Sequence, residues 1–453
     1  MEGHTQRPHE GQTWRGWVRH QLWLPPIVGV VVGGVLGVLL VQPTFFLGRL
    51  LTGAAWQATA TEARSTLSAV LGIALTSLSI ILSLSMLVVQ NAAGQYSPRL
   101  LRMYLHSAGV RVVIPVFVGT SVFCLVAAHE FGFISEVERA PRPALALAMV
   151  LLVLCEGSLI YSVFQTFQLM RVENLVRRVR EDTLGTARTL ERFRANDLPE
   201  PPPARPRSAA ARVLRVRHPG FITAIDAPAI LDVATARKLV VHVERAIGEP
   251  VTRDEDVGWF EAEAVASSPP PEIADEALVL RAIQLDRWRD DDRDLALGVR
   301  QLVDVAIKAL SPGINDPYTA VEAVDQLTFL LCELSRMKLG PRVLADASGT
   351  PRVFLHGPSL RDLLVLATDQ ILRYGVEEPA VVLRLLRLTA AVGQRLHEAE
   401  DRRAARERLH AILAVSEKTP SGASGQSLLR RHAEALEQAL DGGPWPPLPA
   451  IGF

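Results

Sequence analysis

Cysteines and aromatic residues are scarce in this sequence, and it has no excess of charge of either sign. Its 453 residues include three cysteines, 6% aromatic residues, and 48 basic against 48 acidic side chains. Cys124, Cys155 and Cys332 lack the spacing of metal ligands, so we interpret them as small buried apolar residues. Zero net charge gives no reason to expect a nucleic-acid partner, which usually requires a clustered basic surface.

Charged residues are also missing from long windows of the N-terminal part. Residues 21–48, 65–98 and 112–129 contain no Asp, Glu, Lys or Arg, and residues 143–170 contain only Glu156. A helix needs about 20 apolar residues to cross the hydrocarbon core of a bilayer. The sequence therefore predicts an α-helical membrane domain at 21–170 with four transmembrane helices. Its expected partner is the lipid bilayer.

The distribution of arginines predicts the orientation of these spans. With four spans, the segment 1–20, the loop near 90–111 and the C-terminal part share one side of the membrane, and that side carries most of the flanking arginines. The positive-inside rule then places both termini in the cytoplasm.

Small and polar residues recur along one face of the second span. Wound at about 3.6 residues per turn, they fall within a stripe about 80° wide. The pore-lining or helix-packing candidates on this span are Ser68, Gly72, Thr76, Ser79, Ser83 and Gln90. One interpretation is close packing against another helix, and the other is a hydrated path in a homo-oligomer. The pattern alone leaves both open.

Glu156 and two arginines are further candidates in this part of the chain. Glu156 lies near the middle of the fourth span, where an ionised carboxylate costs at least ~2.5 kcal/mol. It would select cations or relay protons, or else stay protonated and bond to a neighbouring span. Arg99 and Arg102 belong to a predicted interfacial helix and would face lipid phosphates.

The remainder of the chain is predicted to be a mixed α+β, mainly helical, cytoplasmic domain. Helical periodicity continues from the fourth span to about Phe193, which indicates a stiff arm. The predicted organisation is a helical arm and Pro-rich linker at 171–208, a small β-rich module at 209–266, a mainly helical domain at 267–441 with a β-hairpin near 343–355, and a flexible tail at 442–453. The module's strands are expected at 213–216, 220–225 and 239–243.

Residues 278–285 are predicted as a helix with one apolar face, and the acidic run 290–292 as a solvated loop. The later segment Ser311–Pro317 joins two predicted helices, the second of which starts with a good N-cap residue followed by proline. Its ligand-loop candidates are Ser311, Gly313, Asn315 and Asp316, because exposed amides at a helix N-terminus hold anions. The alternative is a rigid corner between helices.

Catalytic signatures are missing. We find no nucleophile with a base, no metal-ligand spacing and no phosphate-binding loop. The sequence therefore predicts no catalytic residue, no metal site and no cofactor, and we do not expect an enzyme.

Two motifs resemble the DUF2254 family of bacterial integral membrane proteins. One is the run 95–101, QYSPRLL, and the longer one joins 300–306, RQLVDVA, to 309–320, ALSPGINDPYTA. The resemblance covers about residues 20–400 and implies four spans followed by a β module that starts near Gly220. It departs from the family pattern where Asp290 and Arg293 replace Thr and Gln. The activity of the family is unknown, so the resemblance supports topology only.

These observations lead to two hypotheses for a multi-pass protein of the bacterial plasma (inner) membrane. The first is a homo-oligomeric ion channel or transport protein, in which the second span lines the path and the cytoplasmic domain gates or assembles it. The second is a membrane-anchored ligand- or protein-binding scaffold or sensor without transport activity, whose recognition surface is the loop Ser311–Pro317 and its neighbouring helix. The first requires a small ion as partner, and the second requires a ligand or protein.

Overall fold

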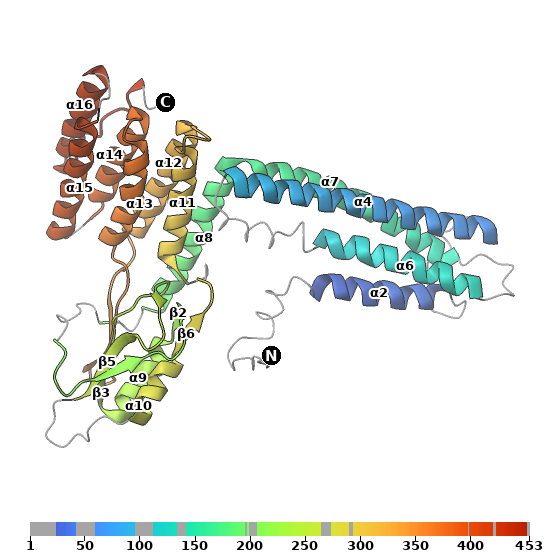
Figure 1. Cartoon of the computed structure of the whole chain (residues 1–453), viewed down its shortest axis with the longest axis horizontal. Coiled ribbons are helices and arrows are strands. Elements are labelled where there is room, and N and C mark those ends of the chain that lie inside the picture. Colours follow the sequence, from blue (N-terminus) through green and yellow to red (C-terminus); the bar gives the residue numbers. More distant parts are fainter. Residues whose placement is uncertain are drawn as a thin grey trace. The chain divides into compact units, whose positions relative to one another are not determined.

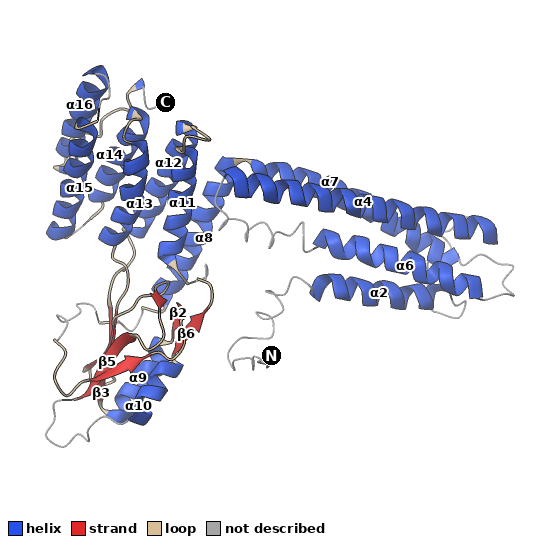
Figure 2. Ribbon diagram, viewed as in Figure 1, coloured by secondary structure: helices blue, strands red, loops and turns tan. Residues whose placement is uncertain are grey.

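The computed structural model describes residues 24–41, 59–95, 112–133, 142–194, 197–198, 206–263, 273–289, 293–396, 398–419 and 423–450. The chain divides into two compact units. We name Met1–Gly94 with Pro98–Arg171 the membrane unit, and Gln95–Ser97 with Val172–Phe453 the C-terminal unit. Helices dominate both units, and the strands of the described residues belong to the C-terminal unit (Figures 1 and 2).

Apolar helices make up the described part of the membrane unit. They are α2 (Leu24–Val41), α4 (Ala60–Gln95), α6 (Ile114–Phe133) and α7 (Arg142–Met170). Among the described residues, α2, α4 and α7 contain segments long and apolar enough to cross a membrane, whereas the apolar part of α6, Ile114–Glu130, is shorter. Three candidate spans are therefore supported, and the predicted fourth is not confirmed.

Helices α2 and α6 pack at very close range and run in the same direction. Their contacts join Gly29 with Pro115, Gly33 with Gly119, and Gly37 with Val126. A methyl group added at Gly29 would lie 2.6 Å from the carbonyl oxygen of Pro115, and one added at Gly33 would overlap that of Gly119. Glycine at every fourth position thus lets the two backbones meet, as in small-residue packing between membrane helices.

Helix α4 packs on α6 and α7, as two apolar clusters show. In one cluster, Leu67 of α4 lies with Cys124 of α6 and Ala144 of α7. In the next, Ile81 of α4 lies with Phe117 of α6 and Cys155 of α7. Residue numbers on α4 and α7 rise together while those on α6 fall, so α4 is parallel to α7 and antiparallel to α6. The four helices alternate in direction along the chain, and Figure 1 shows α4 beside α7 and α6 beside α2.

Two small sheets form the β part of the C-terminal unit, with strand orders β1-β5-β3-β8-β7 and β4-β2-β6. The strands are β1 (Arg212–Arg215), β2 (Gly220–Ile225), β3 (Leu239–Val243), β4 (Pro250–Val251), β5 (Asp256–Ala262), β6 (Ile283–Asp286), β7 (Arg342–Ala345) and β8 (Pro351–Leu355). The central strand β3 pairs antiparallel with β5 and parallel with β8, and every residue of it is buried. Helices α9 (Ala227–Arg237) and α10 (Ile273–Arg281) contribute to the same core.

A layer of helices completes the C-terminal unit. They are α8 (Val172–Arg192), α11 (Leu295–Ala309), α12 (Pro317–Leu334), α13 (Leu360–Gly375), α14 (Pro379–Gly393), α15 (Ala399–Glu417) and α16 (Ala423–Leu440). Helix α8 packs on α11 and α12, and α14 packs on α12, α15 and α16. Fully buried leucines such as Leu302, Leu327 and Leu330 fill these contacts.

The strands expected at 213–216, 220–225 and 239–243 are present as β1, β2 and β3, and the hairpin expected near 343–355 is β7 with β8. The helix predicted at 278–285 is wrong in its second half, because α10 ends at Arg281 and β6 follows. Ile283 and Leu285 pair with β2, so a distant strand decides their conformation. The sheets also extend past the module predicted at 209–266, since β6, β7 and β8 lie outside it.

The segment predicted as a stiff arm continuous with the fourth span and the tail predicted to be flexible both pack within the C-terminal unit. The predicted arm is interrupted between Met170 and Val172, and α8 buries Val176 and Val179, so α8 belongs to the C-terminal core. Part of the tail predicted to be flexible is held by Arg387. Its guanidinium lies 5.1 Å from the ring of Trp445 and donates to the carbonyl oxygen of Pro446 at 3.0 Å.

Candidate functional site

The polar stripe of α4 faces away from the helices that α4 packs against. Its members Ser68, Gly72, Thr76, Ser79, Ser83 and Gln90 are all exposed. The buried face of α4 consists of Ala63, Leu67, Val70, Ala74 and Ile81. At about 3.6 residues per turn, the two faces lie about 180° apart on the helix.

Two hydroxyls on this stripe are hydrogen-bonded within the helix. Thr76 donates to the carbonyl oxygen of Gly72 at 2.8 Å, and Ser83 donates to that of Ser79 at 2.9 Å. Such bonds lower the cost of a hydroxyl in a membrane and leave its oxygen able to accept another bond. The stripe is therefore compatible with both packing and a hydrated path.

Glu156 lies on α7 next to the fully buried Cys155 and is itself half-buried. Within the described part of the chain, its carboxylate forms no hydrogen bond and no ion pair. A carboxylate at this depth requires water, a proton or a partner. Its proposed role stays a prediction.

The loop Ser311–Pro317 uses several of its polar groups internally. The amides of Ile314 and Asn315 donate to the carbonyl oxygen of Ser311, at 3.0 and 2.9 Å. Asp316 caps α12 by accepting from the amide of Thr319 at 3.1 Å, and Asn315 has a positive φ of 51°. These bonds favour the rigid corner over the ligand loop, and Gly313 remains exposed without a positive φ.

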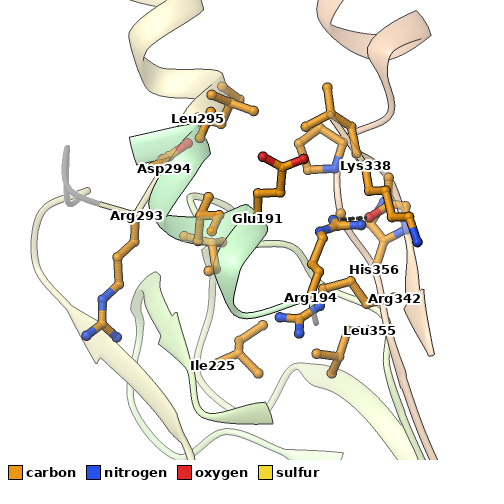
Figure 3. Close-up of a pocket in the computed structure, with 18 residues that line it drawn as sticks. Glu191, Arg194, Ile225, Arg293, Asp294, Leu295, Lys338, Arg342, Leu355 and His356 are labelled. Carbon is orange, nitrogen blue, oxygen red and sulfur yellow. Dashed lines mark hydrogen bonds between the residues drawn. The ribbon is translucent and has the colours of Figure 1, made fainter. Parts of the chain in front are cut away.

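A cavity in the C-terminal unit gathers charged residues that the sequence does not bring together. It has a volume of about 100 Å³ and lies between the end of α8, the start of α11 and the loops beside β7 and β8 (Figure 3). Its charged lining residues are Glu191, Arg194, Arg293, Asp294, Lys338 and Arg342. Apolar side chains such as Leu190, Ile225 and Leu355 form much of the remaining wall.

Two of these charges are already compensated. Arg342 forms a bidentate pair with Asp197, both hydrogen bonds being 2.9 Å long. Asp294 is buried, accepts from Arg289 at 2.6 Å, and caps α11 by accepting from the amide of Leu297. Neither residue is therefore free to compensate a ligand.

Arg194 is a half-buried cation of the cavity. Its guanidinium donates to the carbonyl oxygen of Gly340 at 2.7 Å, and within the described residues it has no ion pair. Burial, with a further contribution from Arg342, lowers the pKa of Arg194 below its usual value, while the nearby Asp197 and Glu191 oppose that shift. Its positive charge is thus placed in a poorly solvated position.

The sequence-based candidates miss this cavity because its residues come from segments far apart in the chain, from Ala187 to Pro358. The sequence does contain a signal for the α2–α6 contact, namely Gly29, Gly33 and Gly37 at every fourth position. Arg99, Arg102 and the acidic run 290–292 lie outside the described residues. No group of three potential metal-ligating residues occurs among those described.

Comparison with known proteins agrees with the helical membrane unit. The family model described as "Predicted membrane protein (DUF2254)" matches residues 19–391. This chain belongs to the DUF2254 family. Relatives in the family include the uncharacterized protein Mb1321c of Mycobacterium bovis and the uncharacterized protein Rv1290c of Mycobacterium tuberculosis. Each is 29% identical over 434 residues, which cover 94% of this chain and 82% of the relative. No solved structure matches this DUF2254 chain.

Proposed function

We propose that this DUF2254 protein is a homo-oligomeric channel or transport protein, with α4 lining the path and the C-terminal unit gating or assembling it. The observation that carries the proposal is the outward position of the α4 stripe. The stripe lies opposite the face that packs inside the protomer, and exposed apolar residues such as Ile73, Leu75 and Ile80 flank it. In a lone protomer this polar face would meet lipid, whereas in an oligomer copies of α4 would share it around a hydrated axis.

Glu156 supports the same proposal. It is partly accessible, and it makes no hydrogen bond or ion pair within the described residues. Water in a conducting path would solvate this carboxylate, which would then favour cations.

We propose further that all four helices cross the membrane, with both termini in the cytoplasm of the plasma (inner) membrane. Helix α6 runs parallel to α2 along the glycine contacts and antiparallel to α4, so it covers the depth that those candidate spans cover. Alternating directions are what four successive crossings require. The arginines that flank the spans then lie on the inner side under the positive-inside rule.

Ion flux through purified protein in liposomes tests the proposed function. Wild-type protein should conduct, Ser79→Leu and Ser83→Leu should reduce flux about tenfold by removing polar lining and narrowing the path, and Glu156→Gln should weaken cation preference. Val31→Leu on the exposed side of α2 is the control for added bulk and should conduct normally. Absence of flux across a range of salts, pH values and membrane potentials would contradict the proposal.

Cysteine cross-linking tests the oligomer separately. Thr76→Cys, on the stripe, should form disulfides between copies under mild oxidation, whereas Val153→Cys, exposed on α7, should not. Equal cross-linking at both positions would remove α4 from the proposed axis.

A further inference from the structure

The cavity beside α8 combines a surplus of positive charge with apolar lining residues, as a binding site for an organic anion does. Of its charged lining residues, Arg342 is paired with Asp197 and Asp294 with Arg289. Arg194, Arg293 and Lys338 then remain against Glu191, which is three positive charges against one negative. This surplus is not neutralised by ion pairs within the described residues.

Arg194 is the residue best placed to hold an anion. It projects from the end of α8 into the region between β8 and the start of α11, near Glu191, while Arg293 extends away from the centre of the site (Figure 3). One hydrogen bond to the carbonyl of Gly340 leaves donors of its guanidinium unused. A half-buried guanidinium binds carboxylate or phosphate oxygens strongly, because few water molecules compete for its donors.

The apolar wall restricts what such an anion carries. Leu190, Ile225, Leu295 and Leu355 line the cavity beside the charged groups. A ligand with only an anionic group would leave this wall in contact with water, whereas an alkyl or ring body would cover it.

We propose that this cavity binds a small organic anion, a carboxylate or phosphate monoester with an apolar body, through Arg194 assisted by Lys338. Glu191 would disfavour ligands of higher negative charge by repulsion. The proposal goes beyond ion conduction and does not depend on it, because binding is measured without flux.

Isothermal titration of the full chain in detergent micelles tests the proposal with three probes of equal chain length: hexanoate, hexyl phosphate and neutral 1-hexanol. We expect one or both anions to bind and 1-hexanol to bind at least about tenfold more weakly, because it lacks the charge that pairs with Arg194. A preference between the two anions assigns the head group. No binding of either anion at millimolar concentration, or equal binding of 1-hexanol, would overturn the proposal.

Variants assign the binding to this cavity. Arg194→Gln should weaken anion binding about tenfold or more, and Lys338→Gln, at an exposed position, about threefold. Glu191→Gln should strengthen it about threefold by removing the repelling charge. Arg192→Gln is the matched control, since Arg192 is exposed at the end of the same helix and does not line the cavity, and it should bind as wild type does. Unchanged affinity in both Arg194→Gln and Lys338→Gln would place the ligand elsewhere and overturn the assignment.

Discussion

The membrane unit and the C-terminal unit are both held together by helix packing, but the α2–α6 contact of the first and the contacts of α11, α12 and α14 in the second use side chains of different size. Helices α2 and α6 meet through Gly29, Gly33 and Gly37, which bring backbone against backbone. Helices α11, α12 and α14 instead meet through fully buried Leu302, Leu327 and similar residues.

The solvent around each unit explains the difference. In water, burying a leucine removes apolar surface from contact with the solvent, so large side chains stabilise the contact most. In a bilayer, lipid tails are as apolar as leucine, so helices associate through close packing, which small residues permit. The same helical geometry therefore selects glycine at the α2–α6 contact and leucine between α11, α12 and α14.

The largest expected effect comes from adding a side chain to the α2–α6 contact. Gly33→Leu should lower the free energy of unfolding of the membrane unit by more than about 3 kcal/mol, because a side chain there overlaps the backbone of Gly119. Buried Cys124 and Cys155 report the loss through the temperature at which they react with a thiol dye, in a Cys332→Ser background. Gly34→Leu is the control, since a methyl group there lies 3.8 Å from the nearest atom, and it should unfold at nearly the wild-type temperature.

Removing a large side chain should have its strongest effect in the C-terminal unit. Leu302→Ala should cost about 3 kcal/mol, because Leu302 is completely buried and its loss leaves a cavity. Thermal unfolding of the full chain in detergent, followed by near-ultraviolet circular dichroism, measures the change. Val365→Ala, at a residue 44% exposed, should change stability by less than about 1 kcal/mol, and an equal loss at both positions would contradict the comparison.

One helix contact in the C-terminal unit also depends on a glycine, as the α2–α6 contact does. A methyl group at Gly298 of α11 would overlap the side chain of Thr183 on α8. Gly298→Ala should therefore destabilise this unit by about 2 kcal/mol, and Thr183→Ala in the same chain should restore part of that loss, because it removes two of the three overlapping atoms. A double-mutant cycle of thermal unfolding measures the coupling between the two residues. If the stability losses of the two single variants simply added in the double variant, the cost of Gly298→Ala would not come from contact with Thr183.

A buried histidine makes the stability of the C-terminal unit depend on pH. Burial, and secondarily the charge of Arg387, lowers the pKa of His432 to about 4. Between about pH 6.5 and 4, His432 binds more protons in the unfolded state than in the folded state. Its contribution to the stability is therefore complete above pH 6.5 and falls as the pH is lowered. We expect His432→Gln to remove about 1–2 kcal/mol of this pH dependence, measured by thermal unfolding across that range. An unchanged slope would contradict the shift.

The smallest effect is expected on the outward face of α4. Gly72→Ala should change the free energy of unfolding of the membrane unit by less than about 0.5 kcal/mol, because nothing lies within 4 Å of an added methyl group. The thiol-dye assay used for Gly33 measures it. A large loss within the protomer would show that α4 packs through its polar stripe.

Much of the fold is predictable from local patterns. Missing charges locate the apolar helices, β-branched runs locate β1, β2 and β3, and Asp316 with Pro317 locates the start of α12. Residues 283–286 are not predictable in this way, because their alternation of Ile and Leu suits a short strand only when β2 lies beside it. The cavity is not predictable either, since Arg194 and Gly340 meet only after α8 packs on the C-terminal core.

The sequence by itself determined which part of the chain has apolar membrane helices and which part is suited to water, because hydropathy is a property of each segment and does not depend on a partner. It also determined the helices with strong caps, whose bonds span three or four residues. Only the tertiary structure decided which face of α4 is buried, which sheet includes β8, and which cations share a cavity. These features depend on contacts between distant segments, and no local pattern specifies them.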